Sequence, residues 1–282
     1  LGTGYSARVV AATAGPAQLD MTYQAGGLNW RAGYTLNLAG DERSGNLSGK
    51  VALANATDAD FRAARLRLVA GDITTVAPPP QPRALKGARM EMMAMSADSA
   101  AAAPEPRAAH DLHLYDLPGR YDLPRGTTQR LALVDAVALP LRKRYVLENH
   151  VQMHQAMISG EVPRQSPRIH LSFRNDKKSG LGSALPAGVI RIYGADSGLP
   201  LLLGEDRIDH TPDGEKVDLT IGRSFDITAR RKQVAFNNTG DRRQFDVTYE
   251  VVLKNAKSTG SVVEVVEHIP GEWRVAQENL AY

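Results

Sequence analysis

The sequence contains no cysteine, and this absence excludes several kinds of chemistry at once. Without thiols the chain cannot form disulfides, iron–sulfur clusters, thiolate zinc sites or a cysteine nucleophile. It also lacks any apolar run of the roughly 18 to 20 residues that a membrane-spanning helix requires. We therefore predict no transmembrane segment in these 282 residues.

A strong charge of either sign is lacking too. The 34 basic and 31 acidic residues give a formal net charge of +3, and both signs are mixed along the chain. Basic clusters occur at residues 142–144 and 230–232, without the interleaved aromatic side chains of a nucleic-acid-binding platform. Because lysine and arginine commonly protect exposed strand edges, we interpret both clusters as solvated edges and predict no nucleic-acid partner.

Most of the sequence shows the period-two alternation of half-buried β-strands. In the first half, this alternation is clearest at Leu28, Trp30, Ala32, Tyr34, Leu36 and Leu38. Leu19, Met21 and Tyr23 alternate in the same way, and Gly26 and Gly27 between the two runs predict a hairpin turn.

The second half shows the same alternation, first at residues 169–173 and over its longest run at residues 245–253. Between these runs, the Pro-Asp-Gly sequence at residues 212–214 is typical of a tight turn. It predicts a hairpin that joins residues 206–210 to residues 217–221.

These patterns predict an all-β fold of two antiparallel, immunoglobulin-like β-sandwich units, at residues 1–155 and 160–282. Residues 73–109 hold a proline run, a methionine cluster and an alanine run, and we predict a disordered insert there. A soft copper site is the alternative interpretation of the methionines. Trp273 and Val275 predict a further strand shortly before Tyr282, so we expect closing strands to be missing and an edge to be unpaired.

Histidine is the best remaining candidate for a metal ligand in a chain without cysteine. His150 and His154 have the i, i+4 spacing that places two imidazoles on one helical face, but no glutamate of a zincin-type motif lies between them. His210 is the third candidate. A cluster at residues 110–113 would lie on a strand, where neighbouring side chains point to opposite faces. We favour ordinary surface positions for all of them and assign no metal, cofactor-binding or catalytic residue.

Six separated segments resemble one bacterial family and follow the order that this family has. They are residues 23–34 (YQAGGLNWRAGY), 51–57 (VALANAT), 185–193 (LPAGVIRIY), 203–205 (LGE), 210–212 (HTP) and 221–226 (IGRSFD). The chain thus resembles a bacterial domain-of-unknown-function family that also forms the C-terminal part of mucoidy inhibitor A-like proteins. The resemblance implies a β-rich, exported protein and transfers no catalytic residue. Within these segments we expect Trp30 in the core and Gly188 at a turn or a close backbone approach.

We therefore expect a non-enzymatic binding or structural module of the bacterial envelope, periplasmic or secreted, with a protein or polysaccharide partner and no cofactor. Strand pairing with a partner uses backbone groups and leaves almost no sequence signature, which fits a chain with many strands and few catalytic motifs. The alternative is a hydrolase or metal-dependent enzyme whose His, Asp and Glu residues converge only in the folded chain. Its first candidates are His150, His154 and His210.

Overall fold

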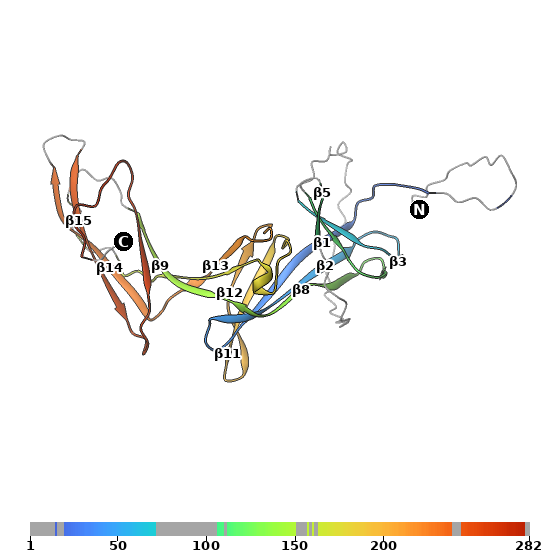
Figure 1. Ribbon diagram of the computed structural model, residues 1–282, viewed down its shortest axis with the longest axis horizontal. Coiled ribbons are helices and arrows are strands. Elements are labelled where there is room, and N and C mark those ends of the chain that lie inside the picture. The colour runs from blue at the N-terminus through green and yellow to red at the C-terminus, as the bar shows by residue number, and fades with distance from the viewer. Residues whose placement is uncertain are drawn as a thin grey trace, which may run out of the picture.

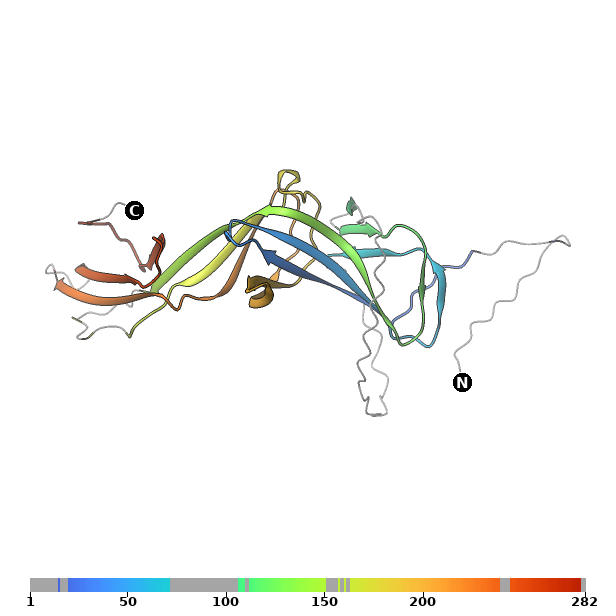
Figure 2. The ribbon, with the colours of Figure 1, turned by 90° about the horizontal axis from the view of Figure 1, so that it is seen from below.

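The computed structural model describes residues 15, 20–71, 106–109, 112–150, 157, 160, 163–238 and 244–279. Within these ranges the chain is all-β, as predicted, and none of the described segments forms a helix with the length and apolar character needed to span a bilayer. The elements are β1 (Leu28–Leu38), β2 (Ser44–Asn55), β3 (Phe61–Ala64), β4 (Arg67–Ala70), β5 (Pro106–Ala109), β6 (Leu112–Asp116), β7 (Tyr121–Leu123), β8 (Thr128–Pro140), β9 (Arg142–His150), β10 (Arg168–Arg174), the short 3₁₀ helix η1 (Lys177–Ser179), β11 (Gly188–Asp196), β12 (Leu199–Ile208), β13 (Lys216–Arg223), β14 (Ile227–Asn238), β15 (Phe245–Asn255) and β16 (Val263–His268). The arrangement is elongated, with β3 and β5 towards one end and β14 and β15 at the other (Figure 1, Figure 2).

The larger sheet has five strands in the order β12-β11-β1-β2-β8. Its central strand, β1, forms where the alternation predicted it, and its side chains from Ala32 to Leu38 alternate between buried and more exposed positions. β2 pairs antiparallel with β1 and β8, as neighbouring segments commonly do. β1 also pairs in parallel with β11, a strand from the second half of the chain. Local alternation did not predict this long-range pairing.

The parallel contact between β1 and β11 depends on Gly188. A Cβ atom at this position would lie 2.6 Å from the carbonyl oxygen of Ala32 and 3.0 Å from Cε2 of Tyr34. Real Cβ atoms do not approach backbone oxygens so closely, so a larger residue would push the two strands apart. The close backbone approach expected for Gly188 is therefore present.

A second sheet has four strands in the order β13-β10-β9-β16. β10 is antiparallel to both of its neighbours, whereas β16 joins β9 in parallel. β14 and β15 form a separate antiparallel hairpin, which confirms the long strand predicted at residues 245–253. Two small sheets, β3-β7 and β4-β6-β5, complete the described strands.

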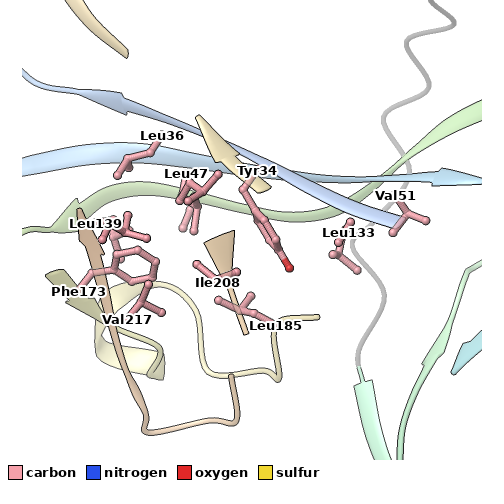
Figure 3. Packing of buried hydrophobic residues seen from close by; sticks show 14 of the residues in the cluster. Tyr34, Leu36, Leu47, Val51, Leu133, Leu139, Phe173, Leu185, Ile208 and Val217 are labelled. Atoms are coloured by element: carbon pink, nitrogen blue, oxygen red, sulfur yellow. The ribbon is translucent and has the colours of Figure 1, made fainter. Parts of the chain in front are cut away.

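The two larger sheets share one hydrophobic cluster, which gives the sandwich-like arrangement. Leu36 and Leu47 come from the five-stranded sheet, and Phe173 and Val217 come from the four-stranded sheet (Figure 3). Leu36 and Leu47 have no solvent exposure. The alternating apolar residues of both halves of the sequence therefore meet in one core.

Tyr34 and Tyr115 are the largest side chains that are fully buried in this core, and Tyr34 lies on its central strand β1. Its hydroxyl donates a hydrogen bond to the carbonyl oxygen of Pro186 at 2.7 Å, which links β1 to the segment before β11. Burial raises the pKa of Tyr34 well above its usual value, and the nearby Tyr115 adds to the effect. Trp30 is half-buried against the same cluster, with its ring centroid 6.5 Å from that of Tyr115, as expected for a residue at the core.

Two of the predicted strands are absent. Residues 20–27 form no strand, and Met21 and Tyr23 are exposed, so Gly26 and Gly27 do not close a hairpin. Residues 271–279 also form no strand, although Trp273 and Val275 alternate there. Alternation was insufficient in both segments because no described strand lies alongside to pair with their backbone groups.

Three further expectations differ from the structure. The turn at residues 212–214 connects β12 to β13, but these strands lie in different sheets and form no hairpin. Residues 142–144 lie in β9 and pair with β10, whereas β16 pairs with β9 only from Tyr145 onward. Lys143 and Arg144 form ion pairs with carboxylates, so this cluster is not a purely solvated edge. Residues 106–109 of the predicted disordered insert form β5, which pairs with β6. The part of the predicted insert that precedes β5, including its methionines, lies outside the described residues.

Each larger sheet combines strands from residues 1–155 with strands from residues 160–282. The five-stranded sheet joins β1, β2 and β8 to β11 and β12, and the four-stranded sheet joins β9 to β10, β13 and β16. The predicted division into two units, at residues 1–155 and 160–282, therefore does not correspond to separate sheets and stays a prediction about how the chain folds.

Candidate interaction surface

The two described histidines among the three candidates, His150 and His210, lie on separate segments of the chain. His150 is the last residue of strand β9, so its side chain does not follow the helical spacing on which the pairing with His154 depended. His210 is exposed after β12 and accepts a hydrogen bond from the Ala187 N–H through Nδ1 at 3.2 Å. His154 lies outside the described residues. In the part of the chain that the structure describes, no group of three His, Asp or Glu side chains could hold a metal ion.

The C-terminal strands form two facing layers, which we call the hairpin layer (β14 and β15) and the β9–β16 layer. Arg231 of β14 donates two hydrogen bonds to Glu267 of β16, at 3.1 Å from Nε and 2.8 Å from Nη2. Glu267 also accepts a hydrogen bond from Nδ2 of Asn149, on β9, at 2.8 Å. Because this ion pair crosses from one layer to the other, it identifies the faces that are directed towards each other.

Two aromatic rings support the same contact between the layers. The guanidinium of Arg231 lies 3.7 Å from the ring centroid of Tyr249, on the neighbouring strand β15. Lys257, which follows β15, donates a hydrogen bond to the hydroxyl of Tyr145 on β9 at 2.5 Å. The cations therefore each contact an aromatic ring as well as an oxygen atom, an arrangement that stabilises them away from bulk water.

Apolar side chains on these facing surfaces remain open to solvent. Arg231 is paired with Val251 in the hairpin, so the alternate residues Val247 and Leu253 share its face. Val247 is 38% exposed and Leu253 is 42% exposed. On β16, Val265 lies on the face of Glu267 and is 38% exposed. Inward-facing residues of a closed sandwich are nearly fully covered, so these two layers are joined by their ion pair but incompletely closed.

Strand edges lie beside this apolar surface. In the described part of the chain, β15 pairs only with β14, and β16 pairs only with β9. β15 is 11 residues long, and its outer edge presents a row of backbone N–H and C=O groups. A long edge next to partly exposed valine and leucine side chains can pair with an added extended chain.

A row of charged side chains crosses the opposite face of the four-stranded sheet. Arg144 of β9 donates hydrogen bonds to Glu264 of β16 at 3.0 Å and to Asp218 of β13 at 2.5 Å. Asp218 also lies 3.1 Å from Nδ1 of His170 and accepts a hydrogen bond from Lys216 at 2.7 Å. Burial raises the pKa of Asp218, but the hydrogen bonds from Lys216 and His170 and the charges of Lys216 and Arg144 outweigh it and hold that pKa below its usual value. The row links the four strands with charges that compensate one another.

Sequence reasoning missed both charged groups because their members come from distant strands. Arg144 and Arg231 belong to the two basic clusters that were interpreted as solvated edges. Arg231 is instead buried, and Arg144 bonds to two carboxylates. The one available signal was Glu267, a charged residue in step with Val263 and Val265 on the apolar face of a strand. A charge at such a position requires a partner.

A family model matches residues 19–274 of the chain, a range that includes every strand described above. This chain belongs to the DUF4139 family. The family is described as a domain of unknown function. The match also includes all six segments on which the resemblance to a bacterial domain-of-unknown-function family was based. No curated protein and no solved structure gives a significant match. The function of this DUF4139 domain must therefore be inferred from its own residues.

Proposed function

We propose that this DUF4139 domain is a non-enzymatic binding module of the bacterial envelope, periplasmic or secreted, which holds a protein partner by adding one of the partner's strands to β15. The observation that carries the proposal is the outer edge of β15, with which no strand of the described ranges pairs, beside the exposed Val247 and Leu253. Placement in the envelope rests on the resemblance to the C-terminal part of mucoidy inhibitor A-like proteins.

An added strand would contribute two kinds of free energy at this edge. Its backbone would pair with the N–H and C=O groups of β15, and alternate side chains would cover Val247 and Leu253. Full burial of a valine or leucine side chain contributes about 1.5 to 3 kcal/mol. Because these two side chains are already more than half covered, each would contribute roughly 1 kcal/mol more. Main-chain pairing would therefore supply most of the affinity, and the apolar side chains would set the register.

A protein strand fits this surface better than a polysaccharide does. Sugars present hydroxyl groups that need polar partners when water is removed. On the facing surface, the exposed Val247 and Leu253 are aliphatic and offer no such partners, whereas the exposed Asp246, Thr248, Glu250 and Lys254 lie on the other face of β15. The alternative of a hydrolase or metal-dependent enzyme requires a converging group of His, Asp and Glu, and the described residues bring no three such side chains together in a group that could hold a metal ion. His150 ends β9, whereas His210 lies between β12 and β13.

The test is affinity capture of the full-length, tagged protein from mildly crosslinked envelopes, with identification of the proteins that are retained in near-equal amounts. Two variants are compared with the wild type. Leu253→Lys places a charge on the facing surface, and Val252→Lys places the same charge on the opposite face of the same strand. The two positions are similarly exposed, at 42% and 44%, so they are matched for their effect on folding.

We expect a partner protein with the wild type and with Val252→Lys, and its loss with Leu253→Lys. Equal retention by both variants would show that the facing surface is not the binding site. Recovery of the domain without any protein, together with its binding to purified envelope polysaccharide, would replace the protein partner with a carbohydrate one. Circular dichroism of both variants checks that the strands remain folded.

A further inference from the structure

The adjacent ends of β9 and β16 bring two histidines together. His150 is the last residue of β9, and His268 is the last residue of β16. These strands run in parallel, and the two residues are directly paired in their register. Residues 118 positions apart in the sequence, counted as 268 minus 150, therefore share one face at one end of the sheet.

The two imidazole rings lie side by side. Their centroids are 4.7 Å apart, and the angle between the ring planes is 27°. Both residues are exposed, so the outer edges of the rings are accessible from solvent. Two nitrogens bound to one ion at about 2.0 to 2.1 Å each lie roughly 3 Å apart. Rotation about the side-chain bonds of two adjacent rings can reach that separation without movement of the strands.

We propose that His150 and His268 form a cross-strand binding site for a divalent first-row transition-metal ion. Neutral imidazole suits Cu²⁺, Ni²⁺ and Zn²⁺, and Cu²⁺ binds most tightly in the general order of affinities. Glu148, two residues earlier on the same face of β9, lies 3.6 Å from Arg168 and is already engaged by it. The site therefore has two protein ligands, and water completes the coordination.

A bound ion would fasten β16 to β9. In the described part of the chain, β16 pairs with no strand other than β9, and it carries Glu267 to the ion pair with Arg231. A metal that binds only the paired arrangement stabilises it by mass action. This role does not depend on the proposed partner of β15, and the two proposals can fail separately.

The test uses the chelator-treated, untagged protein and Cu²⁺ alone, titrated by calorimetry near pH 7.5. We expect one ion per chain, and a loss of affinity of at least about tenfold in each of His150→Ala and His268→Ala, because each removes one of two ligands. His210→Gln is the control, since it changes an exposed histidine in the connection between β12 and β13. Electron paramagnetic resonance of the Cu²⁺ complex should show two imidazole nitrogens in the wild type and one in His268→Ala.

A separate variant, His154→Ala, distinguishes this site from the pairing that sequence spacing suggested. Affinity lost with His154→Ala and unchanged with His268→Ala would overturn the cross-strand site. Binding weaker than about 1 mM in the wild type would also overturn it. A Zn²⁺-dependent rise in the melting temperature that is present in the wild type and absent in His268→Ala would support the fastening of β16.

Discussion

Removal of the Glu267 carboxylate should destabilise the C-terminal layers strongly. The variant Glu267→Ala removes two hydrogen bonds from Arg231 and one from Asn149. It leaves a guanidinium whose side chain is only 9% exposed without its counter-charge. The remaining contact with the Tyr249 ring cannot replace a bidentate carboxylate.

The expected magnitude follows from the burial of the two partners. Breaking a fully buried ion pair by removal of one partner costs about 3 to 5 kcal/mol. The Glu267 side chain is 26% exposed, so water can replace part of the hydrogen bonding that Arg231 loses. We therefore expect the lower end, about 3 kcal/mol. For a chain of this size, such a loss lowers the midpoint of the affected thermal transition by roughly 6 to 12 °C.

The assay is thermal and urea unfolding of the wild type and three variants. Glu205→Ala is the matched control, because Glu205 pairs with Arg191 at 3.0 Å on the surface, where both side chains are about half exposed. A surface pair should cost at most about 1 kcal/mol. The double variant Arg231→Met/Glu267→Leu should recover most of the stability, since it leaves no unpaired charge. If Glu267→Ala costs no more than Glu205→Ala, the ion pair does not hold the two layers together.

Three further predictions test the core and the charged row. Gly188→Ala should destabilise the protein by more than about 2 kcal/mol in urea unfolding because its Cβ would clash with β1, whereas Gly26→Ala, with nothing within 4 Å, should have little effect. Tyr34→Phe should cost about 1 to 2 kcal/mol at neutral pH through the lost hydrogen bond. Because burial raises the folded-state pKa of Tyr34, the wild type but not this variant should lose that stability as the pH rises above about 10. The folded-state pKa of Asp218 is lowered, so the stabilisation from its carboxylate is complete above the usual pKa of about 4 and is lost as the pH falls below that value. In unfolding experiments, the difference in free energy of unfolding between the wild type and Asp218→Asn should therefore shrink from about pH 7 to about pH 3. A constant difference would contradict the ion network.

The candidate surface was only partly accessible to sequence reasoning. An interaction through strand edges was expected from the many strands and few catalytic motifs, but its position was not. Val247 and Leu253 have the alternation of an ordinary buried strand, and only the structure shows that they remain 38% and 42% exposed. Their exposure depends on how far the hairpin layer lies from the β9–β16 layer, and the sequence of β15 carries no information about that distance.

The two histidines illustrate the same limit. Sequence spacing drew attention to His150 together with His154, because residues four apart meet on a helix. The structure places His150 at the end of a strand and opposite His268, which no local pattern connects with it. Sequence spacing therefore paired His150 with a neighbour in sequence, whereas the structure places it beside a neighbour in space.

By itself, the sequence determined the all-β class, most of the strands and the family, because alternation and short motifs are local properties of the chain. It also determined that no chemistry based on thiols is possible. Only the tertiary structure decided that β1 pairs in parallel with β11 and β16 with β9, and that Arg231 is buried against Glu267. Pairing of this kind depends on which distant edges meet when the shared core closes. That closure is set by the packing of all strands together, and no single segment of the sequence encodes it.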